Sequence, residues 1–174
     1  EDTIGIYRIS GSMFLLRNSN SAGNYDTSIQ FGVAGDMPLI GDWDGDGIDT
    51  IGLYRPSDRT FRLRNSNSAG YSDVPVFSYG NSGDIPIVGD WNNDGIDTIG
   101  VYRNSTGYFY LRNYNSAGVN DVPAFKYGGS KDMPIIGDWN NDGIDTIGLY
   151  RINARTGVGI FYLRNSNSGG SPDK

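Results

Sequence analysis

Residues 41–55 read GDWDGDGIDTIGLYR, and the chain contains this stretch three times. It returns at 89–103 as GDWNNDGIDTIGVYR and at 137–151 as GDWNNDGIDTIGLYR, so each copy begins 48 residues after the previous one. The chain also opens on the end of such a stretch, because residues 2–8 read DTIGIYR. Self-similarity at a fixed period of this length indicates a tandem repeat, in which each unit is one supersecondary element.

Each copy predicts a β-hairpin with an acidic loop. Residues 38–43 form the expected first strand, and residues 50–55 form the second, which shows the period-2 alternation of a strand. Gly47 lies between them and permits the sharp turn that a short loop requires.

The loop carries carboxylates at alternating positions, and they suggest a cation. Asp42, Asp44 and Asp46 would repel one another unless a positive charge lies between them. The backbone carbonyl of Ile48 and the carboxylate of Asp49 could complete an all-oxygen shell, which suits calcium better than a transition metal. The expected ligands in the three copies are Asp42, Asp44, Asp46, Ile48 and Asp49; Asp90, Asn92, Asp94, Ile96 and Asp97; and Asp138, Asn140, Asp142, Ile144 and Asp145.

The same loop sequence also fits a turn without metal. Asp-Gly and Asn-Asp-Gly segments make hairpin turns unaided, because Asp and Asn side chains bond their own backbone and tolerate positive φ. In two copies the middle ligand is Asn92 or Asn140, which lowers the charge of the loop. Calcium sites and metal-free Asx turns are therefore both open interpretations.

The stretch resembles the FG-GAP/VCBS-type repeat of integrin-α-like β-propellers. Phe31-Gly32, Tyr79-Gly80 and Tyr127-Gly128 resemble that family's leading Phe-Gly, and the acidic loops resemble its D-x-[DN]-x-D-G calcium loop. The resemblance covers most of each repeat and implies a β-propeller, calcium in the hairpin loops and a binding role at a surface or outside the cell. The family's last acidic ligand falls at the ninth loop position. This chain has threonine there, and its aspartate comes one residue earlier.

Composition excludes several classes of function. The chain has no cysteine and no histidine, so it offers no disulfide, thiol nucleophile, imidazole base or zinc ligand of either type. A net charge of −6 disfavours nucleic acid, which requires basic contacts to phosphate. No apolar run approaches the length of a membrane span. The chain starts in mid-repeat at Glu1 without a methionine, so we expect a mature piece or a fragment.

We expect an all-β fold: a β-propeller-like array of four-stranded antiparallel blades with a 48-residue repeat. The chain forms a single repeat domain, 1–174, with partial units at its ends and two complete units, 36–83 and 84–131. The partial units are 1–35, which lacks a leading strand, and 132–174, which lacks a closing strand. The expected strands are 3–8, 13–18 and 28–31; 38–43, 50–55, 60–65 and 74–79; 86–91, 98–103, 108–113 and 122–127; and 134–139, 146–151 and 160–165. A four-bladed propeller with two incomplete blades, a piece of a longer array, and end-to-end pairing of copies all fit this count.

The third strand of each unit repeats a Phe-x-Leu-Arg-Asn pattern. Phe and Leu should face the core, because alternate residues of a strand lie on one face. The recurrent arginine fits an ion pair or a backbone bond within its own unit, and ligand binding is the alternative. The Asn/Ser loop that follows fits either a turn or hydrogen bonds to sugar. The positions are Phe14, Phe61, Phe109 and Phe161 for the aromatic residue and Arg17, Arg64, Arg112 and Arg164 for the arginine.

The sequence thus predicts a non-enzymatic, calcium-stabilised repeat module for extracellular adhesion, binding or structural display, secreted or held at the cell surface. A lectin-like glycan-binding module is one alternative. A self-assembling unit that forms a ring or filament is another. The expected partners are a cell-surface protein or glycan, or further copies of the chain joined through open strand edges. Neither nucleic acid nor membrane insertion is expected.

Overall fold

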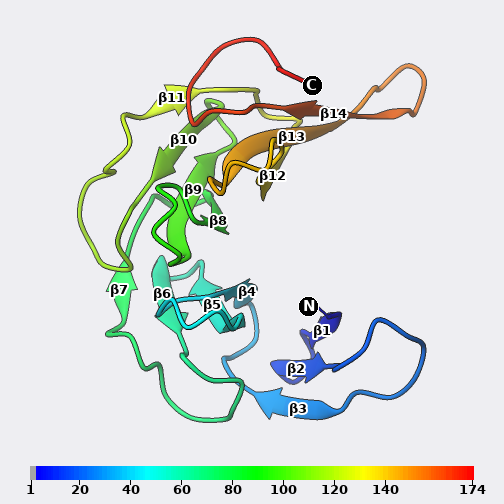
Figure 1. Ribbon diagram of the computed structural model, residues 1–174, viewed down its shortest axis with the longest axis vertical. Helices are drawn as coiled ribbons and strands as arrows, with labels where there is room; N and C mark the ends of the chain where they lie inside the picture. The colour runs from blue at the N-terminus through cyan, green and yellow to red at the C-terminus, as the bar shows by residue number, and fades with distance from the viewer. Residues whose placement is uncertain (1–2) are drawn as a thin grey trace.

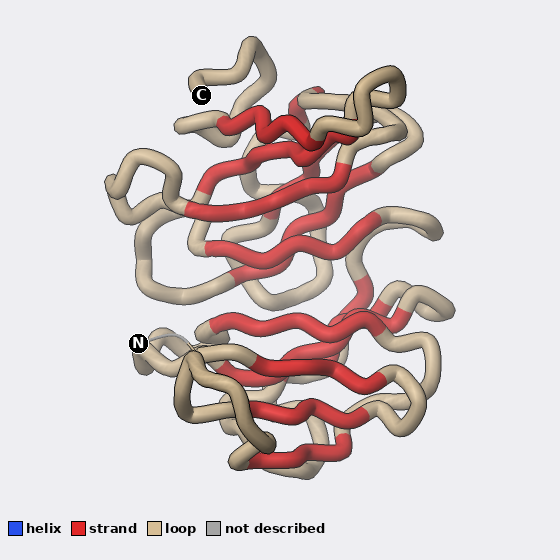
Figure 2. The backbone as a smooth tube through the Cα atoms, turned by 90° about the vertical axis from the view of Figure 1, so that its right-hand side faces the viewer, coloured by secondary structure: helices blue, strands red, loops and turns tan. Residues whose placement is uncertain are grey.

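The structure is a computed structural model that describes residues 3–174, and this part of the chain consists of strands and loops without a helix (Figure 2). The prediction of an all-β fold is therefore confirmed. Its fourteen strands form four antiparallel sheets, each built from strands that are consecutive in the chain.

The two end sheets have three strands each and the two middle sheets have four. The first contains β1 (Gly5–Arg8), β2 (Met13–Leu16) and β3 (Thr27–Gln30). The second contains β4 (Met37–Gly41), β5 (Thr50–Arg55), β6 (Thr60–Leu63) and β7 (Phe77–Ser78). The third contains β8 (Ile85–Gly89), β9 (Thr98–Arg103), β10 (Tyr108–Leu111) and β11 (Phe125–Lys126). The fourth contains β12 (Met133–Gly137), β13 (Thr146–Ile152) and β14 (Gly159–Leu163).

The acidic hairpin has the same register in every unit that carries it. Gly41 pairs with Thr50, and the equivalent residues of the other two hairpins pair likewise, so the acidic loop always occupies the eight positions in between. The closing strands are shorter than predicted. β7 and β11 have two residues each, and a proline two residues before each strand has no N–H to donate to a ladder.

The four sheets follow one another around an open arc (Figure 1). The leading strands β4, β8 and β12 lie on its concave side, where β4 contacts β8 and β8 contacts β12. The closing strands β7 and β11 lie on the convex side. The first and last sheets stand on opposite sides of the opening, so the described residues do not close a ring.

The hydrophobic core lies between successive sheets. Tyr54, Phe61 and Phe77 of the second sheet pack against Ile99 and Val101 of the third. The junctions before and after repeat this arrangement with the equivalent residues. Each of the two middle sheets thus supplies aromatic residues to one junction and aliphatic residues to the preceding one, which is how a repeat array builds a continuous core.

The predicted core face of the third strands is confirmed in three units and wrong in one. Phe14, Phe61 and Phe109 are at most 2% exposed, whereas Phe161 is 59% exposed. Phe161 differs because no further sheet covers its side of β14 in the described residues.

A bidentate ion pair joins the start of the leading strand to the end of the second strand. Arg103 donates through Nε and Nη2 to the buried carboxylate of Asp84, with both distances 2.9 Å. The equivalent pairs are Asp36 with Arg55 and Asp132 with Arg151. Hydrogen bonds from Arg151 hold the pKa of Asp132 below its ordinary value despite burial. These arginines, which lie at the ends of the second strands, therefore stabilise the fold of their own units.

Candidate metal centre

The acidic loops adopt one backbone conformation in all three copies. Gly45 and Gly47 of the first loop have φ angles of 76° and 83°. The other loops have asparagine in place of Gly45, and Asn93 and Asn141 adopt positive φ angles of 58° and 63°. Asparagine tolerates this left-handed region better than most residues, so the Gly-to-Asn exchange leaves the loop unchanged.

The first aspartate of each loop holds the turn together. The carboxylate of Asp42 accepts hydrogen bonds from the backbone N–H groups of Gly45, Asp46 and Gly47, at 2.8, 3.2 and 2.7 Å. Asp138 does the same in the last loop, and its bonds from Gly143 and neighbouring N–H groups lower its pKa. The local side-chain-to-backbone bonds expected of Asx turns are therefore present.

Asp42, Asp44 and Asp46 meet as a group. Each offers one carboxylate oxygen, and these three oxygens lie within 4.8 Å of one another. Asp42 is half-buried, and the other two side chains are exposed. In residues 3–174 this is the single place where three side chains of the types Asp, Glu, His and Cys are close enough to share an ion.

The other two loops replace the middle carboxylate with an amide. The Nδ2 group of Asn92 donates to Asp94 at 2.9 Å, and Asn140 makes the same bond to Asp142. In these two loops the asparagine amide therefore donates a hydrogen bond to the neighbouring carboxylate. In the first loop Asp44 stands at this position and has no N–H group to donate. Loop 42–48 is for this reason the strongest candidate for a cation.

In two of the predicted ligand sets, the last aspartate bonds to the preceding repeat. The Oδ2 atom of Asp97 accepts the backbone N–H of Asp42 in the preceding unit at 2.9 Å, and the N–H of Asp97 donates to the carbonyl of Asp42 at 2.7 Å. Asp145 makes the same pair of bonds with Asp90, at 3.1 and 2.8 Å. Both residues connect neighbouring repeats, and neither joins a group of metal-binding side chains.

This placement has an electrostatic consequence. Burial raises the pKa of Asp97 to about 6 and also raises that of Asp145. Packing between units is the reason, because β8 lies against β4 and brings Asp97 to the loop of the previous hairpin. Ligation of a cation by these two carboxylates stays a prediction. Asp49 instead lines a cavity of about 530 Å³ beside β1.

The isoleucines of the predicted sets lie directly after the loop glycine. The backbone N–H of Ile48 donates to Asp46 Oδ1 at 2.9 Å, and Ile96 and Ile144 make the same bond to Asp94 and Asp142. Asp46 is thereby fixed toward the loop backbone through one oxygen, and its other oxygen stays available to a cation. Ligation by the isoleucine carbonyls stays a prediction.

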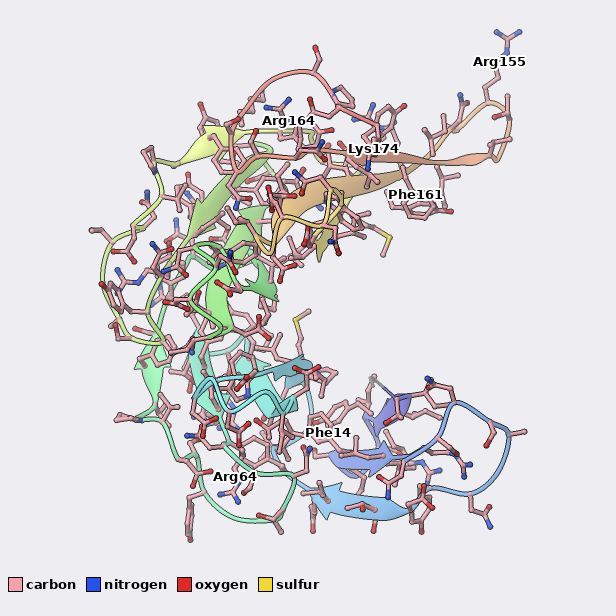
Figure 3. All side chains as sticks on the ribbon, in the orientation of Figure 1. Phe14, Arg64, Arg155, Phe161, Arg164 and Lys174 are labelled. Atoms are coloured by element: carbon pink, nitrogen blue, oxygen red, sulfur yellow. The ribbon has the colours of Figure 1, made fainter. Side chains whose placement is uncertain are left out.

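The recurrent arginine of the third strand is scaffold. The guanidinium of Arg64 is buried and donates to Ser66, Ser68 and the carbonyl of Tyr71 in the loop that follows (Figure 3). It also forms an ion pair with Asp73 at 3.4 Å. Arg164 repeats these contacts with its own loop. Arg112 repeats them except for the first serine, because Tyr114 stands at that position. The interpretation of this arginine as an internal anchor is confirmed.

The polar loop is also bonded to the acidic hairpin. Asn67 donates through Nδ2 to the carbonyl of Asp49 at 2.9 Å, and Asn115 and Asn167 bond Asp97 and Asp145 in the same way. These bonds were not predicted from the sequence. The recurrence of asparagine at Asn67 and, 48 residues later, at Asn115 was the signal that both have the same role in their units. Much of the Asn/Ser rim is therefore engaged in holding the unit together.

The loop tryptophans pack inside the array. Trp43 is 4% exposed and belongs to the core cluster that includes Ile99 and Val101 of the next unit. Its ring lies over Gly41 and Gly52, where any Cβ atom would approach it within about 3 Å. Trp91 takes the same place at the next junction. Both tryptophans therefore pack on the neighbouring unit.

Comparison with known proteins found no matching family model, no similar curated protein and no similar solved structure. The resemblance to FG-GAP/VCBS repeats therefore rests on the sequence pattern alone. In residues 3–174 there is no helix long and apolar enough to cross a membrane.

Proposed function

We propose that this chain is a non-enzymatic, calcium-stabilised repeat module. The observation that carries the proposal is the meeting of Asp42, Asp44 and Asp46 within 4.8 Å in a preformed loop. Three carboxylates this close repel one another at neutral pH, and a hard divalent cation relieves the repulsion. Calcium is the cation of choice, because it accepts oxygen ligands in flexible geometry and completes its shell with water and backbone carbonyls.

The architecture we propose is an arc of propeller-type blades. In support, each sheet is antiparallel, its strands follow chain order from the concave to the convex side, and successive leading strands touch (Figure 1). Such an array presents loops at both rims on a rigid frame, which suits adhesion or display outside the cell. The partner we propose is a cell-surface protein or glycan.

Calcium should act on stability in this proposal. Extracellular calcium modules bind with dissociation constants of about 10⁻⁴ to 10⁻³ M. At about 1 mM calcium, a site at the tighter end adds roughly 1.4 kcal/mol to the free energy of unfolding by mass action. For a chain of this size that stabilisation corresponds to a rise of about 3–6 °C in the melting temperature.

A thermal melt with calcium and with excess chelator tests this expectation. The wild-type melting temperature should rise with calcium and fall with chelator, and magnesium at equal concentration should have a smaller effect because it demands stricter octahedral geometry. The matched variant is Asp44→Asn, which gives the loop the donor set of its two neighbours and should abolish most of the rise. Equal melts with calcium and chelator would contradict the proposal and leave the loops as Asx turns.

A further inference from the structure

Every junction between sheets in this chain has two different sides. One side is the forward face of a sheet, defined by the tyrosine of its second strand and the phenylalanine of its third, such as Tyr102 and Phe109. The other side is the rear face of the next sheet, defined by two aliphatic residues of its second strand, such as Ile147 and Leu149. The same pairing occurs at all three junctions.

The first sheet has a rear face that no residue of the described chain, 3–174, covers. Ile4 and Ile6 are 53% and 67% exposed, whereas the residues at the same positions of the other sheets are at most 2% exposed. Those buried equivalents are Ile51 and Leu53, Ile99 and Val101, and Ile147 and Leu149. The residue types are the same or closely similar. The difference in exposure therefore comes from whether a neighbouring sheet covers the face.

The last sheet has the complementary face open. Phe161 is 59% exposed and stands out from β14 at the end of the arc, while Phe14 lies where the first sheet meets the second (Figure 3). The aromatic pair is nevertheless formed. Tyr150 and Phe161 have ring centroids 5.0 Å apart, compared with 4.8 Å for Tyr54 and Phe61 and 4.6 Å for Tyr102 and Phe109. A preorganised face loses little conformational entropy when it binds.

We propose that a second copy of this chain supplies the missing contact: the forward face of the last sheet of one copy packs on the rear face of the first sheet of another. The contact continues the junction that the chain already builds three times. It is heterologous, so repetition yields a closed ring if the rotation closes and a filament if it does not. It uses apolar faces rather than strand edges and does not depend on calcium.

Paired variants test the head-to-tail contact by sedimentation velocity at physiological ionic strength. Wild-type protein should form species larger than the 18.9 kDa chain as its concentration rises. Ile6→Asp removes the rear face and leaves the forward face, and Phe161→Asp does the opposite, so each variant alone should stay monomeric. An equimolar mixture should form a one-to-one dimer and nothing larger, because just one productive pair of faces remains.

Matched controls distinguish this contact from non-specific hydrophobic association. Ile9→Asp and Val158→Asp replace residues that are also 67% and 57% exposed but lie outside the two faces, and both should assemble like wild type. Melting curves should show that all four variants are folded, since each replaced side chain is more than half exposed. A wild-type monomer at every concentration, or a mixture of the two face variants that stays monomeric, would overturn the proposal.

Discussion

Replacing Phe109 with alanine should lower the free energy of unfolding by about 3–5 kcal/mol, the usual cost of deleting a buried aromatic side chain. Phe109 is fully buried, pairs with Tyr102 and stacks on Phe125 with ring centroids 5.6 Å apart. Its loss leaves a cavity at the junction between the third and fourth sheets. Because units in such an array stabilise one another, the melting transition should shift as a whole. Urea denaturation followed by tryptophan fluorescence measures the change.

The repeat provides its own control for this substitution. Phe161 occupies the same position in the last unit but is 59% exposed, so Phe161→Ala should cost less than about 1 kcal/mol. The two variants delete the same atoms from the same local sequence pattern. Similar losses from both would show that the junctions between sheets do not hold the core.

Replacing Arg103 with methionine should cost about 3–5 kcal/mol, because it leaves the carboxylate of Asp84 buried without its cation. The Asp84 side chain is 2% exposed, and its remaining described bond is from the backbone N–H of Asn81. Chemical denaturation of the wild type and the variant measures the loss.

Arg62→Met is the comparison for this ion pair. Arg62 meets Asp58 at 3.5 Å, and the aspartate of that pair is 47% exposed. An ion pair so open to solvent contributes about 0–1 kcal/mol, so its removal should change stability little. A second comparison, Arg103→Met combined with Asp84→Asn, should recover part of the loss. If Arg62→Met and Arg103→Met lower the free energy of unfolding equally, the burial of Asp84 is not the cause of the loss.

The sequence predicted the elements well because the repeat gave independent copies of each pattern. The hairpin of residues 38–55, the three-stranded ends and the inward-facing Phe61 and Phe109 all follow from alternation and turn chemistry within one unit. Interactions within one unit determine these features, so a short window of sequence is enough to predict them.

The sequence predicts less well the residues whose surroundings come from a different unit. The carboxylate of Asp97 accepts a hydrogen bond from the backbone of a residue 55 positions earlier, and no pattern within its own loop predicts that contact. Phe161 looks like a core residue, but the sheet that would cover it is not in the described chain. In both cases packing between units, which no pattern within one unit encodes, determines the outcome.

The candidate metal centre was predicted in part for the same reason. Asp42, Asp44 and Asp46 lie within one turn, so their approach follows from the loop sequence. The contrast between the loops was also readable, since Asn92 and Asn140 stand where the first loop has Asp44. What the sequence could not give was the bond from each asparagine to the third carboxylate of its loop, which depends on the side-chain geometry.

Calorimetric titration with calcium, on the wild-type chain and two variants, tests the metal centre most directly. We expect one calcium site per chain, with a dissociation constant of about 10⁻⁴ to 10⁻³ M. Asp44→Asn should remove that site, and Asn92→Asp should create a second one by giving the next loop three carboxylates. No binding heat in the wild type, or equal binding by wild type and Asp44→Asn, would contradict this expectation.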